Sequence, residues 1–345
     1  MSSRIRIMLL LDVLALLVAC APGLALAQDG APRERIRERL LERQHKKAAP
    51  VAGRDASARI TRPGDYMFSI DHGGLPRSYL VHVPRIYKPD MPTPLLMAFH
   101  GGGGNMQLQA DDEYYGLISK SESAGFIAVF PNGYSPFARG MLATWNAGTC
   151  CAAARDKNID DVGFVRAVVA DVQRRLDVDA QRIYATGMSN GAMLTHRLAC
   201  EAADIFNAIA AVAGTDNTRI CLPSRPISVL EIHASNDDHV LFNGGAGAGA
   251  FRDDAKIADF TSVPETIARW TRRNNCSAAP ARVLERPGAY CERYSGCRDS
   301  VEVQLCVTET GGHSWPGAAK VRRGKEPASQ AIFANDVMWD FFNRP

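Results

Sequence analysis

The chain has 345 residues, of which 46% are hydrophobic and 22% are charged, which is ordinary for a globular protein with a large core. Its length allows one or two domains. The net charge of +3 is too small to indicate nucleic acid as a partner, so none is expected.

The first 27 residues have the pattern of an export signal. Two arginines precede an apolar run at 8–18, and small residues at 25–27 offer a cleavage site. The run is shorter than the roughly 20 residues that cross a membrane, so no transmembrane segment is expected. We predict a signal peptide at 1–27 and a secreted protein, extracellular or periplasmic. The alternative is a lipoprotein anchored at Cys20, because the residues before it resemble a lipoprotein cleavage box.

A charged, alanine-containing segment follows at 28–62. It is mostly polar on all sides, with few apolar positions to line a helical face. This pattern predicts a solvated helix or a disordered lead. The catalytic domain is therefore expected at 63–345.

Short β-rich runs alternate with longer helical stretches from residue 66 onward. Several of the runs are apolar throughout, which is typical of a sheet covered on both faces. The alternation predicts an α/β fold with a mainly parallel, eight-stranded sheet and helices on both faces. Strands are expected at 66–70, 77–84, 94–100, 125–131, 182–187, 208–214, 227–234 and 301–308, and helices at 161–176, 190–203, 262–273 and 329–343.

A serine lies between two glycines where the strand at 182–187 turns into the helix at 190–203. The stretch reads Gly187-Met188-Ser189-Asn190-Gly191. Glycines are needed on such a turn because a β-carbon there would collide with neighbouring backbone, and the serine hydroxyl is left exposed. This is the nucleophile elbow of the α/β-hydrolase fold, so Ser189 is the candidate nucleophile. The alternative is that Ser189 only caps the helix.

The acid and then the base follow the serine along the chain in this fold. His313 stands in a glycine-rich loop after the last predicted strand, where an exposed imidazole is expected, so it is the candidate base. Asp237 and Asp238 both follow the penultimate strand, and we predict Asp237 as the acid with Asp238 as the alternative. His233 precedes the acid and is in the wrong order for a base. His239 is too close to the loop that carries Asp237 and Asp238, called the acid loop below, to reach back over the serine.

Two backbone N–H groups are expected to stabilise the oxyanion of a tetrahedral intermediate. One belongs to Asn190, which follows the nucleophile, and the other to Gly102, in the glycine run after the third predicted strand. A nucleotide-binding loop is the alternative use of a glycine run. It requires a Lys-Ser/Thr ending that this run lacks.

Eight cysteines remain after removal of the signal, and their even number in an exported chain predicts disulfides. Neighbouring α-carbons across a trans peptide lie about 3.8 Å apart, below the usual range for a disulfide. Cys150 and Cys151 are therefore each expected to pair elsewhere. Zinc binding is disfavoured because no C-x₂-C pair exists, and no bound metal is predicted.

Several motifs in the right order resemble the secreted polyhydroxybutyrate depolymerase and feruloyl esterase group of α/β-hydrolases. They are "YLVHVP", "HGGGGN", "WNAGTCC", "DDVGF", "RIYATGMSNGAML", "FNAIAAVAG", "IHASNDDHV" and "GGHSWPG". The resemblance runs from about residue 66 to 342 and implies the same nucleophile, acid and base: Ser189, Asp237 and His313. It also implies that Trp145 and Asn146 lie near the substrate cleft. Trp315, two residues after the base, offers an aromatic wall for an acyl or aryl group, with ordinary packing as the alternative.

Three features depart from the group. Gly102 stands where many members carry a cysteine, and Cys291 and Cys306 are additions, so the group's disulfide pattern cannot be transferred. No linker or polymer-binding domain is recognised, which favours soluble or oligomeric esters over solid polymer.

The motifs and the resemblance together predict a secreted serine ester hydrolase that works through an acyl-enzyme without a cofactor. Its expected substrates are hydroxyalkanoate oligomers or related polyesters. One alternative is a feruloyl or acetylxylan esterase acting on plant polysaccharide. A serine peptidase and a non-catalytic binding protein on a hydrolase fold are further alternatives.

Overall fold

The computed structural model describes residues 58–137, 140–250 and 259–344. The predicted signal peptide, Cys20 and most of the predicted lead lie outside these residues. The last part of the lead belongs to the domain, because Ile60 is buried and its N–H donates to the carbonyl oxygen of Arg175. No helix within the described residues has both the length and the apolar character needed to span a membrane.

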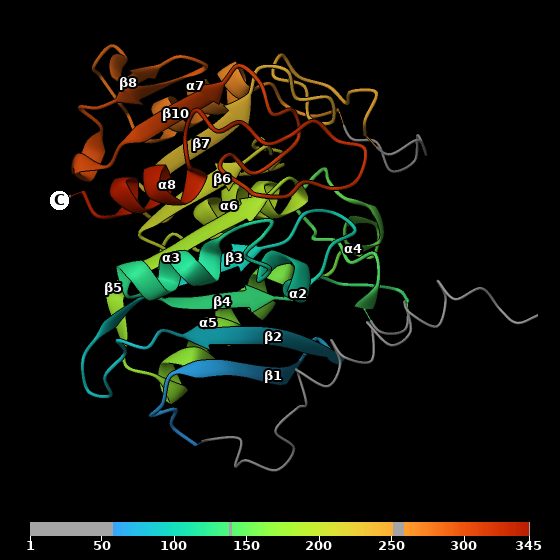
Figure 1. The fold of residues 1–345 in the computed structure, drawn as a ribbon, viewed down its shortest axis with the longest axis vertical. Helices are drawn as coiled ribbons and strands as arrows, with labels where there is room; N and C mark the ends of the chain where they lie inside the picture. The colour runs from blue at the N-terminus through green and yellow to red at the C-terminus, as the bar shows by residue number, and fades with distance from the viewer. Residues whose placement is uncertain (1–57, 138–139, 251–258, 345) are drawn as a thin grey trace, which may run out of the picture. The chain divides into compact units, whose positions relative to one another are not determined.

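In the described part of the chain, ten strands form one sheet in the order β1-β2-β4-β3-β5-β6-β7-β10-β9-β8 (Figure 1). Their bounds are β1 Gly64–His72, β2 Leu75–Val83, β3 Thr93–Phe99, β4 Ile127–Pro131, β5 Val178–Met188, β6 Ala208–Val212, β7 Ser228–Ala234, β8 Ala281–Arg286, β9 Ala289–Tyr294 and β10 Val303–Thr308. The six strands from β4 to β10 in the middle of this order pair in parallel, and the strands at both ends pair antiparallel. The predicted α/β class and the central parallel sheet are confirmed.

The predicted count of eight strands is wrong, because β8 and β9 form an antiparallel hairpin that extends the sheet beyond β10. The residues of β8 are almost all exposed. A strand with neither a buried face nor an apolar run leaves no hydrophobic pattern to read.

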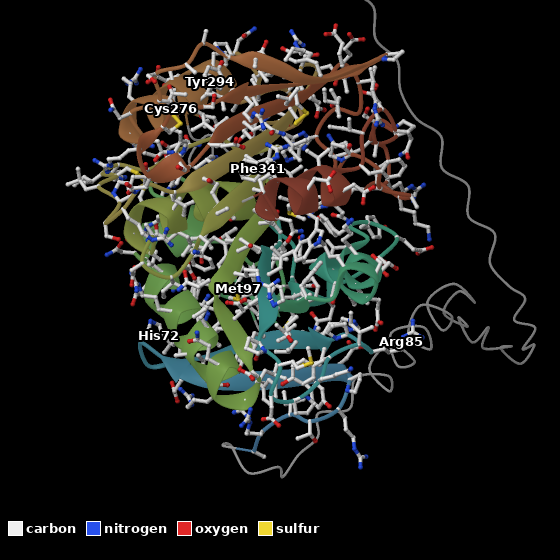
Figure 2. All side chains as sticks on the ribbon, turned by 90° about the vertical axis from the view of Figure 1, so that its left-hand side faces the viewer. His72, Arg85, Met97, Cys276, Tyr294 and Phe341 are labelled. Atoms are coloured by element: carbon white, nitrogen blue, oxygen red, sulfur yellow. A yellow bond between two sulfur atoms is a disulfide. The ribbon has the colours of Figure 1, made fainter. Side chains whose placement is uncertain are left out.

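Helices cover both faces of the sheet (Figure 1). Their bounds are α2 Met106–Gln109, α3 Leu117–Ala124, α4 Ala152–Asp156, α5 Asp161–Arg175, α6 Asn190–Glu201, α7 Val263–Arg273 and α8 Ala334–Phe342, with a short 3₁₀ turn at Arg298–Ser300. Alternate residues of β3 face opposite layers. Met97 packs in the core that includes α5, α6 and α7, and its neighbour Leu96 packs in the core that includes α3 and α8. Figure 2 shows Met97 among the central strands and Phe341 on α8.

The four predicted long helices exist as α5, α6, α7 and α8. The last one begins at Ala334 rather than at 329, because the N–H of Gly317 binds the carbonyl oxygen of Ser329 and holds that residue against the preceding loop. The acidic pair that opens α5 holds the start of the helix in place. Asp160 caps the helix by accepting from Gly163 N at 2.9 Å, and Asp161 binds Arg77 at 2.7 Å.

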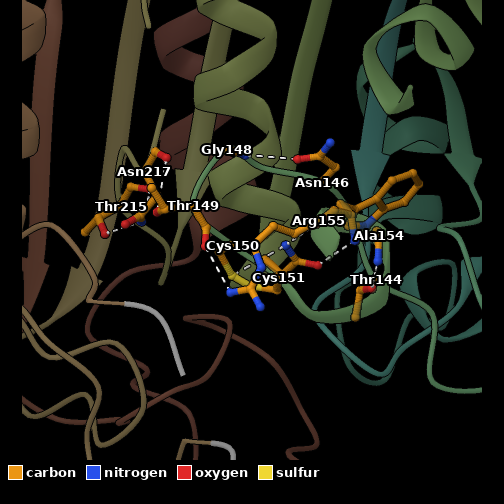
Figure 3. Close-up of a disulfide and its surroundings, with 12 residues drawn as sticks. Thr144, Asn146, Gly148, Thr149, Cys150, Cys151, Ala154, Arg155, Thr215 and Asn217 are labelled. Atoms are coloured by element: carbon orange, nitrogen blue, oxygen red, sulfur yellow. Dashed lines mark hydrogen bonds between the residues drawn. A yellow bond between two sulfur atoms is a disulfide. The ribbon is translucent and has the colours of Figure 1, made fainter. Parts of the chain in front are cut away.

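All eight cysteines of the described residues are paired, which confirms the predicted disulfides. The pairs are Cys150–Cys151, Cys200–Cys221, Cys276–Cys297 and Cys291–Cys306. The expectation that Cys150 and Cys151 pair elsewhere is wrong. It assumed a trans peptide, whereas the peptide between them is cis and their α-carbons are 3.1 Å apart (Figure 3). The added pair Cys291–Cys306 joins directly opposite residues of β9 and β10, and so fastens the extra hairpin to the sheet.

The fold places its functional loops at one edge. The parallel strands β3, β5, β7 and β10 end at Phe99, Met188, Ala234 and Thr308. Parallel strands present their carboxyl ends at the same edge of a sheet, and ligands of open α/β sheets bind there. The glycine run, the elbow, the acid loop and the His313 loop each follow one of these four strand ends.

Candidate active site

The elbow between β5 and α6 holds Ser189 in an unusual backbone conformation. Its φ is 57°, which a non-glycine residue seldom adopts and which is expected of the nucleophile in this turn. A β-carbon on Gly187 would lie 2.5 Å from the carbonyl carbon of Gly191, and one on Gly191 would lie 2.2 Å from the carbonyl oxygen of Phe99. The Ser189 side chain accepts no hydrogen bond from the helix that it precedes. The helix-cap alternative therefore has no support in the geometry.

The glycine run after β3 lies against this elbow. A β-carbon on Gly101 would lie 3.4 Å from the β-carbon of Ser189, so the two backbones approach closely. The loop is held by its own backbone, since Gly103 N donates to Ala143 O at 2.8 Å and Gly104 N donates to Gly101 O at 2.9 Å. Gly102 of this loop lines the same cavity as Ser189.

The second predicted oxyanion donor is Asn190. It is the first residue of α6, so its N–H has no acceptor in a preceding helical turn. Asn190 also lines the cavity beside Ser189. Its side chain is bound to the backbone of Trp145: Oδ1 accepts from Trp145 N at 2.7 Å and Nδ2 donates to Trp145 O at 3.0 Å.

His100 supports the oxyanion loop and was missed by sequence reasoning. Its Nδ1 lies 2.9 Å from Gly101 O, and its Nε2 accepts from Gly133 N at 2.9 Å. Complete burial lowers the His100 pKa to about 4, so the ring is neutral and donates from Nδ1. The histidine that opens the glycine run was the available signal, because a histidine at a strand end can bind the next loop.

Trp145 has a different place from the one predicted for it. It is fully buried, packs edge-on against Phe99 with ring centroids 5.4 Å apart, and donates from Nε1 to His100 O at 2.9 Å. It does not line the cavity of Ser189. Trp145 thus lies near the site, but its ring is behind the glycine run and its polar edge is used by the backbone, so the structure does not bring it into the cavity.

Asn146 also lies away from the cavity. Its Nδ2 donates to Asn158 Oδ1 at 3.2 Å and to Ile159 O at 3.1 Å, and its N–H donates to Asp161 Oδ2 at 2.8 Å. These bonds anchor the loop before α5, so the predicted substrate contact is not seen. Cys151 of the same loop does reach the wall of the cavity.

The acid and the base meet as predicted. His313 Nδ1 and Asp237 Oδ2 are 2.8 Å apart, although 76 residues separate them in the sequence. Asp238, the alternative acid, binds His239 Nδ1 at 2.6 Å and Lys325 at 3.2 Å instead. Of the two neighbours, the structure brings only Asp237 to the base.

The acid loop fixes Asp237 in its ionised form. Its Oδ1 accepts from the N–H groups of His239 at 2.7 Å and Val240 at 3.0 Å. Burial alone would raise the Asp237 pKa, but His313, His233 and these backbone donors hold it below its ordinary value. An ionised Asp237 orients the imidazole of His313 and stabilises its charged form.

A second set of histidines lies entirely buried beneath the acid loop. Glu231 on β7 is 3.0 Å from His196 Nε2 and 3.0 Å from His233 Nδ1, and none of the three side chains is exposed. His196 Nδ1 accepts from Trp270 Nε1 at 3.0 Å, so the ring carries its proton on Nε2 and donates to Glu231.

His233 faces acceptors on both sides. Its Nε2 lies 2.8 Å from Val240 O and 3.4 Å from Asp237 Oδ2, while Nδ1 faces Glu231. Burial would lower the His233 pKa, but Glu231 and Asp237 outweigh it and raise the pKa. The imidazolium form thus satisfies both nitrogens, and His233 ties β7 to the acid loop.

A cavity of about 190 Å³ opens at the edge where these loops meet. Gly102, Ser189, Asn190, His313 and Trp315 line it. Trp315 is almost completely buried, packs edge-on against Tyr115 at 5.4 Å, and donates from Nε1 to Asn335 Oδ1 at 3.1 Å. It forms part of the wall, as predicted, and its indole is fixed in place.

His239 also lines the cavity, beside His313. Its ring stacks on that of His313 with centroids 4.4 Å apart and 8° between planes. Asp237, His239 and His313 are the one group in the described residues whose ligand atoms come close enough to share a metal ion, within 4.8 Å of one another. In stacked, parallel rings the nitrogen lone pairs do not converge on one point, so the geometry fits a hydrogen-bonded acid–base pair better than a metal site.

Comparison with known proteins agrees with this geometry. Residues 78–234 match the family described as Esterase PHB depolymerase. The matched segment holds the oxyanion loop and the elbow, and it ends just before Asp237. The chain is also 29% identical over 244 residues to Feruloyl esterase B of Piromyces equi, which covers 69% of this chain and 42% of that protein.

A second relative is aligned over most of its length. The Probable feruloyl esterase C of Aspergillus niger is 28% identical over 276 residues, which cover 77% of this chain and 83% of that protein. Among solved structures, the Acetyl xylan esterase from Aspergillus awamori superposes with a TM-score of 0.54 at 15% identity, covering 80% of this chain and 98% of that one. This last likeness shows the fold. The protein therefore has the fold of the α/β-hydrolases, and its sequence is similar to the Esterase PHB depolymerase family over residues 78–234 and to these feruloyl esterases over longer stretches.

Proposed function

We propose that the protein cleaves carboxylic esters through an acyl-enzyme formed on Ser189. In this mechanism Ser189 Oγ attacks the ester carbonyl while His313 Nε2 takes the hydroxyl proton. The N–H groups of Gly102 and Asn190 bind the oxyanion, and His313 returns the proton to the leaving alcohol. Water, activated by the same imidazole, then releases the acid. The observation that carries this proposal is the 2.8 Å contact between His313 and Asp237 beside the cavity that Ser189 shares.

The proposed substrates are hydroxyalkanoate oligomers or related polyesters, since the matched family is that of the depolymerases. A second candidate is a feruloyl or acetylxylan ester, which is favoured by the names of the aligned relatives. We also propose that the protein is secreted. Four disulfides support this, because such bonds persist in oxidising compartments.

An ester panel tests the proposal on the purified chain without its first 27 residues. The substrates are 4-nitrophenyl butyrate, methyl ferulate and the methyl ester of the linear 3-hydroxybutyrate trimer. We expect Ser189→Ala to lose about 10⁵- to 10⁶-fold in kcat on any substrate that the wild type cleaves. Ser235→Ala is the matched control, because Ser235 is exposed on the acid loop and does not line the cavity.

The panel also separates the candidates. A higher kcat/KM for methyl ferulate favours the plant-wall esters, and a higher value for the trimer favours the hydroxyalkanoates. Near wild-type activity in Ser189→Ala contradicts the mechanism. Absence of turnover on all three substrates supports a binding protein on a hydrolase fold.

A further inference from the structure

One segment brings several positive charges to the cavity. Lys320, Arg322 and Lys325 lie between the His313 loop and α8, and all three line the cavity. No aspartate or glutamate is among the described residues of its lining. The rest of the wall is largely apolar or aromatic, with side chains such as Met193 and Phe260.

The two lysines already have ionic partners. Lys320 binds Glu113, and Lys325 Nζ lies 3.2 Å from Asp238 Oδ2. Neither carboxylate is part of the cavity lining.

Arg322 differs from the two lysines. It is exposed and forms no ion pair with any residue in the described segments of the chain. Glu326 of the same segment is occupied elsewhere, since it accepts from Asn236 Nδ2 and from Gly311 N. The charge of Arg322 acts on the cavity wall: burial raises the Tyr115 pKa to about 12, and Arg322 works against that rise. Among the described residues, the segment therefore presents one guanidinium without an ion-pair partner to a cavity whose wall is largely apolar or aromatic.

We propose that the site prefers esters that carry a carboxylate, and that Arg322 binds this carboxylate. This inference rests on the proposed esterase activity and narrows its substrate class. A guanidinium forms paired, charge-assisted hydrogen bonds with a carboxylate, and a cavity whose described lining holds no acidic side chain does not repel one. A linear hydroxyalkanoate oligomer ends in a free carboxylate at neutral pH, whereas a feruloyl or acetyl ester on neutral polysaccharide has none. The charge pattern thus favours the first class.

Two matched substrate pairs test this proposal. The linear 3-hydroxybutyrate trimer, as free acid and as methyl ester, carries the charge on the alcohol side of its scissile esters. Mono-(4-nitrophenyl) adipate and 4-nitrophenyl hexanoate differ by a carboxylate on the acyl side. The measured quantity is the ratio of kcat/KM for the charged member to that for the neutral member. We expect this ratio to exceed one for at least one pair and to fall as salt is added.

The variants are Arg322→Gln and Arg323→Gln. Arg323 is the matched control, because it is the adjacent arginine, is also exposed, and does not line the cavity. We expect Arg322→Gln to lower the ratio by about five- to tenfold, mainly through KM, as befits the loss of one charge-assisted contact. Arg322→Glu should lower it further, since it places a like charge beside the carboxylate. Arg323→Gln should keep the wild-type ratio.

Two results would overturn the inference. One is a ratio at or below one for both pairs in the wild type, and the other is an equal ratio in Arg322→Gln and Arg323→Gln. In either case the neutral esters still report on the proposed function. Loss of their Ser189-dependent hydrolysis is the separate result that contradicts the esterase itself.

Discussion

Two sets of histidine and carboxylate lie close together at the end of β7, and they differ in their access to the cavity. Glu231 joins His196 and His233 in a network whose side chains are fully buried. Asp237 joins His313, whose side chain is 10% exposed and lines the cavity. Neither histidine of the first set lines the cavity, whereas His313 does.

The two sets have different roles, although Glu231, His233 and Asp237 lie within one short stretch of chain. The buried network holds β7, α6 and the acid loop in fixed positions, because each of its polar atoms has a partner that cannot be replaced by water. The pair of Asp237 and His313 depends on the position in which this network holds the acid loop. We therefore expect changes in the two sets to separate into effects on stability and effects on turnover.

The largest effect on turnover is expected from Asp237→Asn. The asparagine keeps an oxygen for the two backbone donors but cannot stabilise a charged His313 or select its tautomer. We expect kcat on 4-nitrophenyl butyrate to fall by about 10³- to 10⁴-fold. Asp238→Asn is the matched control and should cost less than about threefold, since Asp238 binds His239 and Lys325. A greater loss of kcat in Asp238→Asn than in Asp237→Asn would show that Asp238, and not Asp237, is the acid.

The buried network should respond to Glu231→Gln through stability. Removing one charge of a buried ionic set typically lowers the free energy of unfolding by about 3–5 kcal/mol. Denaturant unfolding followed by fluorescence measures this change. Glu309→Gln, at an exposed residue directly after the neighbouring strand β10, should leave the free energy of unfolding within about 0.5 kcal/mol of wild type.

Turnover per folded molecule sharpens the same experiment. Titration of active sites with a fluorophosphonate gives the folded fraction of Glu231→Gln. We expect kcat per titrated site to stay within about tenfold of wild type, because Glu231 touches neither Ser189 nor His313. An unchanged stability together with a collapse of kcat would contradict the division between the two sets.

The pH dependence of stability should carry the signature of Asp237. Its folded-state pKa lies below the ordinary value of 3.8, so its contribution is fully present above that value and is lost as the pH falls through the folded pKa. The Tm difference between wild type and Asp237→Asn should therefore be constant above about pH 5 and shrink as the pH falls below about 4. A Tm difference that grows as the pH falls would mean that folding raises the Asp237 pKa instead of lowering it.

The smallest effect is expected at His239, which stacks on His313 but does not share its proton. We expect His239→Gln to lower kcat/KM by less than about tenfold, the range of a lost ring contact. The pH profile of kcat/KM should keep its shape. A change in the number of ionisations in that profile would make His239 part of the acid–base chemistry.

Sequence reasoning succeeded for the candidate residues that lie in loops directly after predicted strands. Apolar strands, turn glycines and chain order were enough to place Ser189, Asp237 and His313 in loops that the structure brings to one cavity edge, although their catalytic roles stay predictions. For Trp145, resemblance gave a position near the site but not the direction in which the side chain points, and the ring does not line the cavity. Sequence reasoning also missed the hairpin of β8 and β9, because the residues of β8 are almost all exposed and carry no hydrophobic pattern.

The buried partners were the hardest to predict. His196, Glu231 and His233 come from a helix and a strand, and only the three-dimensional packing shows that they share one network. In the sequence, His233 could be excluded as a base, but nothing there assigned it a partner. Pairing of Cys150 with Cys151 was missed for a simpler reason, since a trans peptide was assumed between them.

The most direct test of the account is covalent labelling of the nucleophile. The protein is treated with a 4-nitrophenyl phosphonate ester, release of nitrophenol is followed, and the labelled peptide is mapped by mass spectrometry. We expect one equivalent of nitrophenol and a single modified residue, Ser189, with labelling slowed by about 10³-fold or more in Asp237→Asn. A label on another residue, or labelling of Ser189 at the wild-type rate in Asp237→Asn, would contradict the claim that the His313–Asp237 pair activates this serine.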